Sequence, residues 1–295
     1  MRLLVGSSAS RISSKPVTTA IVITALLLIP LLILAHGHPT PGVVDAVPYL
    51  DGGVLTFLNV VAQYSPGLAV LARELSNNAV SLQAVLVALF WAAWFSKREP
   101  SSAWQRRSTM LASLVGLFAT VVIAIALRAA LPFRPRPFLN SEIASQFLYL
   151  PFDSTLPVNA HSTSLPAGHA AVFFALATVL WSVSIGLGLA AFLHASLAIC
   201  LPRIYSGLHY PTDILFAAIL AIVTVTAANE LLGRSALIHR LLGWSETHPA
   251  VFYAAFFAFS VEVSLEFSSI RPFLKLLENS YFNKIVLLGM GVATS

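Results

Sequence analysis

Long apolar stretches separated by short polar segments dominate the chain. A helix needs about 20 mainly apolar residues to cross a bilayer. Apolar windows near that length lie at about 17–35, 78–96, 108–128, 168–186, 188–205 and 212–230. The apolar stretch 170–202 is too long for one helix, and the turn signal at 184–188 divides it into two. The pattern therefore predicts an all-α fold, a polytopic membrane helical bundle with a six-span core.

Two further segments have a weaker membrane pattern. Residues 55–73 contain Pro66 and Gly67 and are weakly amphipathic, so we expect them to lie on the membrane surface between the first two spans. Residues 249–265 are apolar but carry Glu262, and a carboxylate in mid-helix disfavours contact with lipid. They form either a seventh C-terminal span or a helix in the interface, and the sequence leaves both open.

These segments divide the chain into three parts. Residues 1–53 are expected to hold an N-terminal tail, an uncleaved first span and an external loop, because the apolar run is longer than a signal-peptide core. Residues 54–232 form a core that contains the clustered arginines and histidines. Residues 233–295 are a C-terminal extension to which the sequence assigns no role.

Composition and charge agree with a membrane protein. Hydrophobic residues make up 57% of the chain and charged residues only 10%, which excludes a soluble globular protein. The net charge of +5 comes from Lys and Arg in short clusters between apolar runs, which indicates membrane topology and not nucleic-acid binding. The one cysteine, Cys200, lies in an apolar stretch, which excludes an intrachain disulfide and a cysteine metal site.

The basic clusters also predict an orientation. Those within 2–15, 97–107 and 234–240 fall on one side when six spans are threaded, and that side is expected to be the cytoplasm. The other arginine-rich segments, near 134–136 and 203, then lie on the opposite side, outside the cell.

Three short segments at that outer face carry the readable chemistry. Guanidinium groups suit bidentate contacts with phosphate oxygens, and they are costly near hydrocarbon unless an anion or a partner meets them. A single arginine here is as readily a snorkelling interfacial charge, but the set predicts a phosphate site. The arginines are Arg128, Arg134, Arg136 and Arg203.

Two histidines accompany these arginines. The segment 166–169 opens a helix, where the freed backbone amides near Gly168 form an anion site beside His169. Asp213 follows His209 by four residues, at which reach a carboxylate fixes the imidazole tautomer and leaves the other ring nitrogen as a nucleophile. Each feature alone is equally compatible with an ordinary helix start, so the prediction of a site depends on their combination.

The three segments, in this order, resemble the signature of the type-2 phosphatidic acid phosphatase family, which also includes vanadium haloperoxidases. The family pattern is Lys-x6-Arg-Pro, then Pro-Ser-Gly-His, then Ser-Arg-x5-His-x3-Asp. The third motif matches from Arg203 through His209 to Asp213 with both spacings intact. The resemblance covers roughly residues 55–230, so 54–232 is the expected catalytic phosphatase core.

The resemblance implies catalytic roles for three residues. His209 is the nucleophile that forms a phosphohistidine, and Asp213 orients it. His169 protonates the leaving oxygen and then activates the water that hydrolyses the intermediate. The family is metal-independent, so no metal and no cofactor is expected.

The resemblance also implies a phosphate-binding set. Arg136 and Arg203, with the helix amides near Gly168, are expected to hold the phosphate oxygens in the transition state. Arg128 and Arg134 complete the candidate set.

The chain departs from the family pattern at three positions. Arg128 is the nearest basic residue to the family's lysine, and it precedes Arg136 by eight positions or Arg134 by six, so its register is open. Ala167 and Pro202 stand where the family has serines. A lost hydrogen bond to a charged group is worth about 1.5–3 kcal/mol, which allows slower or altered catalysis without requiring loss of function.

Other histidines are weaker candidates. His36 and His38 form a His-x-His pair that lacks further metal ligands, and His161 is expected to be a solvated loop residue. His194 lies within a span and is expected to be a hydrogen-bonded core histidine.

By resemblance, the expected activity is that of a membrane lipid phosphatase at the outer face of a bacterial inner membrane. The expected substrate is a polyprenyl diphosphate such as undecaprenyl diphosphate, with phosphatidylglycerophosphate, phosphatidic acid or a lipid A phosphate as alternatives. A lipid phosphotransferase and a non-catalytic membrane scaffold are the competing functions. The expected partners are the phosphorylated lipid and the bilayer, without nucleic acid, and the oligomeric state is left open.

Overall fold

The computed structural model describes residues 46–77, 79–96, 100–131, 133–140, 143 and 163–265, and all regular elements in these ranges are helical. The all-α fold class is confirmed. The longer elements are α2 (Ala46–Tyr64), α3 (Pro66–Asn77), α4 (Ala79–Phe95), α5 (Pro100–Ala130), α7 (Gly168–Trp181), α8 (Ile185–His194), α10 (Pro211–Leu232), α11 (Ala236–Thr247) and α12 (Pro249–Ser264). Three short ones are the 3-10 turn η1 (Pro137–Leu139), the π-helical η2 (Ala195–Cys200) and α9 (Leu201–Tyr205).

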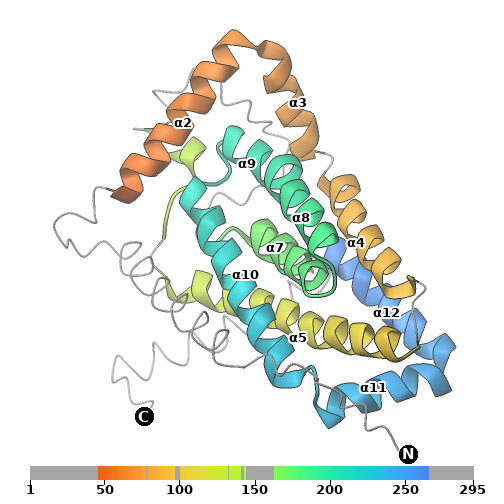
Figure 1. The fold of residues 1–295 in the computed structure, drawn as a ribbon. Helices are drawn as coiled ribbons and strands as arrows, with labels where there is room; N and C mark the ends of the chain where they lie inside the picture. The colour runs from red at the N-terminus through yellow and green to blue at the C-terminus, as the bar shows by residue number, and fades with distance from the viewer. Residues whose placement is uncertain are drawn as a thin grey trace, which may run out of the picture.

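Helix α7 is the centre of the bundle and packs against α5, α8 and α10 (Figure 1). Every residue from Ala170 to Leu180 is buried, because small alanines alternate with large apolar side chains on all faces of this helix. A helix that is apolar all round has no solvent face, so α7 is a core helix that holds its first turn firmly.

Helices α5 and α10 cross in close contact. A Cβ added at Gly116 would lie 2.6 Å from the Val225 Cα, so only glycine fits at this crossing. The Thr120 hydroxyl donates to the Gly116 carbonyl at 2.8 Å and also contacts the Thr224 hydroxyl. These contacts hold the middle of α5 against the C-terminal half of α10.

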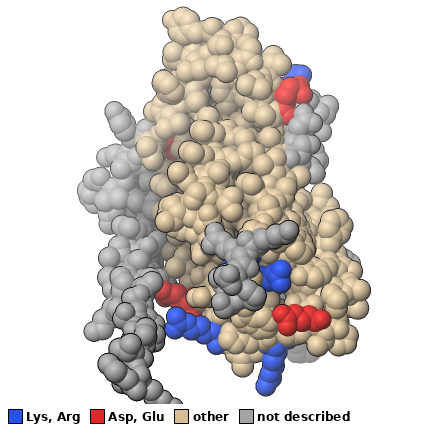
Figure 2. Space-filling model, turned by 45° about the vertical axis from the view of Figure 1, so that its right-hand side comes forward, with Lys and Arg blue, Asp and Glu red and all other residues tan. Residues whose placement is uncertain are grey.

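The helices α8, η2 and α9 follow one another without a break from Ile185 to Tyr205. Large apolar side chains are exposed at every fourth position along them, which is the stripe expected of a helix that faces lipid. The stripe consists of Ile185, Leu189, Leu193, Leu197 and Leu201. On the face shown in Figure 2, charged side chains gather near one end, and a broad uncharged surface separates them from a smaller charged group toward the other end.

Among the described residues, three helices are long and apolar enough to cross a membrane: Ala103–Ala130, Ile185–Tyr205 and Pro211–Leu232. They correspond to the spans predicted at 108–128, 188–205 and 212–230. The spans predicted at 78–96 and 168–186 form the shorter apolar stretches Leu82–Phe95 and Gly168–Trp181. The first predicted span, 17–35, lies outside the described residues, and the count of six stays a prediction.

The segment predicted for the membrane surface forms parts of two helices, α2 and α3. α2 and α3 meet at Ser65 with a bend of 115°, because Pro66 begins the second helix. Together they are apolar enough for one broken span, so their position at the surface stays a prediction. Helix α12 packs on α4 and α11 and is shorter than a typical span, so both alternatives for 249–265 also stay open.

Candidate active site

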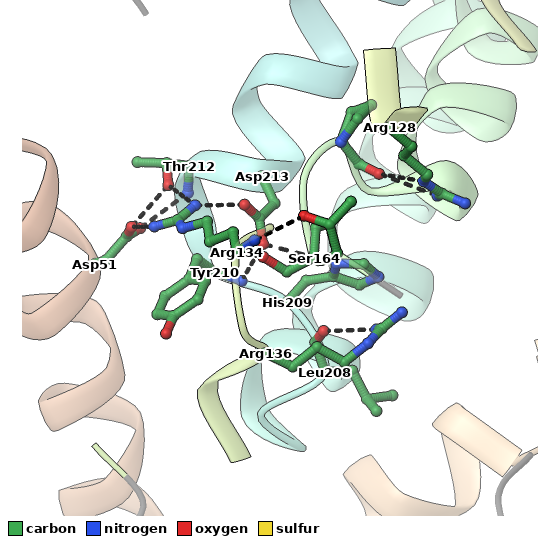
Figure 3. A network of polar contacts seen from close by, with 12 residues as sticks. Asp51, Arg128, Arg134, Arg136, Ser164, Leu208, His209, Tyr210, Thr212 and Asp213 are labelled. Atoms are coloured by element: carbon green, nitrogen blue, oxygen red, sulfur yellow. Dashed lines mark hydrogen bonds and ion pairs between the residues drawn. The ribbon is translucent and has the colours of Figure 1, made fainter. Parts of the chain in front are cut away.

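The three sequence segments meet at one end of the bundle. Their backbones are joined directly: the Ser164 N–H donates to the Arg134 carbonyl at 2.9 Å, and the Ala167 N–H to the Asp213 carbonyl at 3.4 Å. The Phe138 N–H donates to the Gly207 carbonyl at 3.2 Å. The segments that the sequence grouped by motif are therefore one site (Figure 3).

His209 lies just before α10 and is only 3% exposed. Its Nδ1 lies 3.0 Å from the Ser164 carbonyl oxygen and 3.7 Å from Asp213 Oδ2. Because a carbonyl only accepts, Nδ1 carries the proton, and the lone pair is left on Nε2. This is the tautomer in which Nε2 is a nucleophile.

Burial lowers the pKa of His209, and the positive charges of Arg136 and Arg203 act in the same direction, while Asp213 opposes them. The imidazole is therefore neutral at neutral pH. A neutral imidazole is the form that can attack a phosphorus atom.

Asp213 lies in the first turn of α10 and is fully buried. Its Oδ2 accepts the Tyr210 N–H at 2.9 Å, which caps the helix, and its Oδ1 pairs with Arg134 Nη1. A carboxylate in a first turn is stabilised by the helix dipole, so the fold holds Asp213 beside His209 through the backbone.

Arg134 lies between two carboxylates (Figure 3). Besides Asp213, its Nη2 donates to Asp51 Oδ2 at 2.6 Å, and its Nη1 donates to Thr212 Oγ1 at 3.1 Å. Its guanidinium carbon lies 3.9 Å from the centre of the Tyr210 ring. Burial would lower the pKa of Arg134, but the two carboxylates outweigh it and raise the pKa. The structure thus directs this arginine to protein groups.

Asp51 is a member of the site that the sequence did not predict. It lies on α2, is 3% exposed, and accepts the Thr212 N–H at 3.0 Å and the Thr212 hydroxyl at 2.7 Å. The signal in the sequence was an acidic residue in an otherwise uncharged segment, within residues assigned to the N-terminal part. Its partner lies 161 positions away, which no local pattern indicates.

Arg136 and Arg203 lie near His209 and near each other, since the charges of both act on its imidazole. Arg136 Nη1 donates to the Leu208 carbonyl at 2.9 Å, and Arg203 is 7% exposed. Burial lowers the pKa of Arg136, as does the nearby charge of Arg203, while Asp213 opposes both. Two like charges held together beside a neutral imidazole make an electropositive site that an anion would stabilise.

Arg128 lies in the last turn of α5, and its side chain reaches the start of α7. Its Nε and Nη2 donate to the Pro166 carbonyl at 3.2 and 3.0 Å. A Cβ at Gly168 would lie 2.3 Å from Arg128 Nη2, so glycine allows the guanidinium to approach the first turn. Half-buried His169 is the next residue of that turn. The structure thus brings Arg128, Gly168 and His169 together at one helix N-terminus.

The remaining histidines fall outside this arrangement. His194 Nε2 donates to the Leu82 carbonyl at 2.8 Å, as expected of a core histidine. His36, His38 and His161 lie outside the described residues. Within the described ranges, no group of three or more His, Cys, Asp or Glu side chains has the arrangement of a metal site.

Comparison with known proteins gives one finding. The model of the PAP2 superfamily matches residues 109–235, a segment that runs from α5 to the turn after α10. This match confirms the predicted resemblance to the type-2 phosphatidic acid phosphatase family. It also supports phosphatase activity on a phosphorylated substrate at a membrane. No curated protein and no solved structure matches the chain significantly.

Proposed function

We propose that this chain is a metal-independent membrane phosphatase that removes phosphate from a phosphorylated lipid through a phosphohistidine at His209. The observation that carries the proposal is the tautomer of His209, whose Nδ1–H donates to the Ser164 carbonyl and leaves Nε2 for attack. The half-buried Arg136 and the buried Arg203 beside it support an anionic substrate.

In the first step, the Nε2 lone pair attacks phosphorus while the bond between phosphorus and the leaving oxygen breaks. His169 donates a proton to that oxygen, so the leaving oxygen departs protonated. Arg136 and Arg203 hold the phosphate oxygens, and Asp213 stabilises the positive charge that develops on the imidazole. The product is a phosphohistidine and the dephosphorylated or monophosphorylated lipid.

In the second step, His169 takes a proton from water as the water oxygen attacks phosphorus. The bond between phosphorus and Nε2 then breaks, inorganic phosphate leaves, and the neutral imidazole is restored. The amides of the first turn of α7, with Arg128 beside them, stabilise the phosphate oxygens in both steps. Protein charges thereby take the place that Mg²⁺ fills in many other phosphoryl-transfer sites.

The substrate that we propose is a polyprenyl diphosphate such as undecaprenyl diphosphate, at the outer face of a bacterial inner membrane. The lipid-facing stripe on α8–α9 and the apolar pair α2 and α3 beside the site support a substrate that stays in the bilayer. The basic cluster at 234–240 follows α10, and the cluster at 97–107 lies at the start of α5, so both lie at the helix ends away from the site. These clusters support the proposed orientation.

The experiment is phosphate release by purified protein in detergent with excess EDTA. The lipids are undecaprenyl diphosphate, phosphatidylglycerophosphate and phosphatidic acid. His209→Ala is expected to abolish release, and His248→Ala, at an exposed histidine outside the site, is the matched control with full activity. Quenching at alkaline pH, where phosphohistidine survives, and peptide mass spectrometry should locate the intermediate on His209.

The other possible outcomes of this experiment would refute a part of the proposal or support a different function. Full activity of His209→Ala refutes the nucleophile, and a strict need for Mg²⁺ refutes metal independence. Transfer of phosphate to an added lipid or sugar hydroxyl, without free phosphate, supports a phosphotransferase. Absence of release and of phosphohistidine with every lipid supports a non-catalytic scaffold.

A further inference from the structure

Asp51, Arg134 and Asp213 form a continuous chain of charges from α2 to the nucleophile. Asp51 Oδ2 lies 2.6 Å from Arg134 Nη2, Arg134 Nη1 pairs with Asp213 Oδ1, and Asp213 Oδ2 lies 3.7 Å from His209 Nδ1. The two carboxylates are 3% and 0% exposed. Such groups are costly to bury unless each is fully paired, so this chain is a built arrangement.

The contacts of both carboxylates are those of the ionised form. Asp51 accepts hydrogen bonds from the Thr212 N–H, the Thr212 hydroxyl and Arg134. Asp213 accepts from the Tyr210 N–H and Arg134. Two negative charges therefore share one positive charge, and the cluster keeps a net charge of −1 next to His209. Without Asp51, Arg134 would neutralise Asp213, and the remaining pair would carry no net negative charge beside the imidazole.

The donors of Arg134 and Arg136 face different partners, although both arginines belong to one tetrapeptide. Arg134 donates to Asp51, Thr212 and Asp213. Arg136 donates to the Leu208 carbonyl, and its charge acts directly on His209. The two positions therefore differ in what a substitution would remove: a support of Asp213 at Arg134, and a charge beside the nucleophile at Arg136.

We infer that Asp51 and Arg134 are positioning residues for catalysis: they hold Asp213 ionised and in place, so that it stabilises the positive charge that develops on His209, and Arg134 does not bind the phosphate. This inference rests on the proposed function for its steady-state readout. It also assigns α2, the first helix of the described residues, a part in the reaction centre. The effect is expected on the rate of the chemical step and not on the affinity for phosphate.

The test compares Asp51→Asn and Arg134→Gln with Arg136→Ala in the phosphate-release assay. The first two are expected to lower kcat by roughly tenfold or more, with KM and the inhibition constant of inorganic phosphate unchanged. Arg136→Ala is expected to raise that inhibition constant. The double variant of Asp51 and Arg134 should be no slower than the slower single variant, because both act through one pair. Arg134→Lys should recover part of the rate.

Ser76→Ala is the matched control on the same pair of helices. It removes a buried contact of α3, the 3.4 Å approach of the Ser76 and Ser206 hydroxyls, without touching the charge chain. We expect it to keep the full kcat. Equal thermal unfolding midpoints of all variants in detergent show that a lower kcat does not come from partial unfolding.

A second readout needs no substrate. Diethyl pyrocarbonate modifies neutral histidine nitrogens, and peptide mass spectrometry gives its rate at His209. We expect slower modification in Asp51→Asn than in Ser76→Ala. Unchanged kcat and unchanged modification in Asp51→Asn would overturn the inference, as would an Arg134→Gln variant that weakens phosphate inhibition and leaves kcat intact. If the wild type releases no phosphate, the proposed function fails, and the modification rate alone decides this inference.

Discussion

Replacing Gly168 by alanine should displace Arg128 from the start of α7. The added Cβ would lie 2.3 Å from Arg128 Nη2 and 3.3 Å from its Cζ. Ordinary van der Waals contact begins near 3.4 Å, so the guanidinium must move by about 1 Å. The obstacle is the end of a flexible side chain, and the backbone of α7 can stay where it is.

The magnitude follows from the contacts that Arg128 would lose. Its Nε and Nη2 share the Pro166 carbonyl at 3.2 and 3.0 Å, and a shift of this size breaks one of the two bonds or both. One hydrogen bond to a charged group contributes about 1.5–3 kcal/mol. The better helix propensity of alanine offsets about 0.5–1 kcal/mol, which leaves a net loss of stability of about 1–2 kcal/mol. If Arg128 also contacts the transition state, kcat/KM should fall by about 10- to 100-fold.

The assay is thermal unfolding in detergent together with kcat/KM for phosphate release. Gly186→Ala is the matched control, because a Cβ at that position of α8 meets nothing within 4 Å. Adding Gly168→Ala to Arg128→Ala should cause no further loss, since the clashing group is already gone. Wild-type stability and activity in Gly168→Ala, or a full additional loss in the double variant, would refute the reasoning.

Four further expectations concern the same site and its support. Ala167→Ser places a hydroxyl at the N-cap of α7, so we expect about 0.5–1 kcal/mol more stability and equal or higher kcat; a large loss of kcat would contradict it. Burial lowers the pKa of His209, so its imidazole stays neutral in mild acid. The fall of kcat on the acid side of the pH profile should therefore be centred below the ordinary histidine pKa of about 6.5, and a fall centred above that value would contradict this. By the same shift the unfolded chain binds the proton more readily, so stability should fall as the pH drops from about 6.5 toward the lowered pKa, as measured by unfolding at several pH values. Gly116→Ala presses a Cβ against the Val225 backbone at 2.6 Å, and a loss of about 1–3 kcal/mol is expected in thermal unfolding, with an unchanged midpoint as the contrary result.

Hydropathy predicted the helices that expose apolar side chains suited to contact with lipid. The three long helices coincide with predicted spans because each is long and apolar enough to cross a bilayer and exposes large apolar side chains. Helix α7 is shorter than predicted because the protein interior, not the bilayer, surrounds it, and the match between apolar length and membrane thickness no longer applies. Pro66 begins α3, but its position in the sequence does not give the bend of 115° or the contact of α3 with α9.

Motif spacing predicted that His209 and Asp213 lie close together, since the interval between them is about one helical turn and is local. It did not separate Arg134 from Arg136, which are two positions apart and chemically identical; only the fold shows which one meets the carboxylates. Asp51 escaped prediction because a buried ion pair is specified by the partner's charge and not by any pattern in the neighbouring sequence.

The contact between Asp51 and Thr212 also bears on the biogenesis of the protein. A chain still under synthesis that ends before Thr212 already contains the Asp51 carboxylate and the Arg134 guanidinium, but it lacks α10 and Asp213 to complete their pairing. Asp51 and Arg134 can pair with each other at that stage, but the complete charge chain to His209 can form only after synthesis has passed the start of α10.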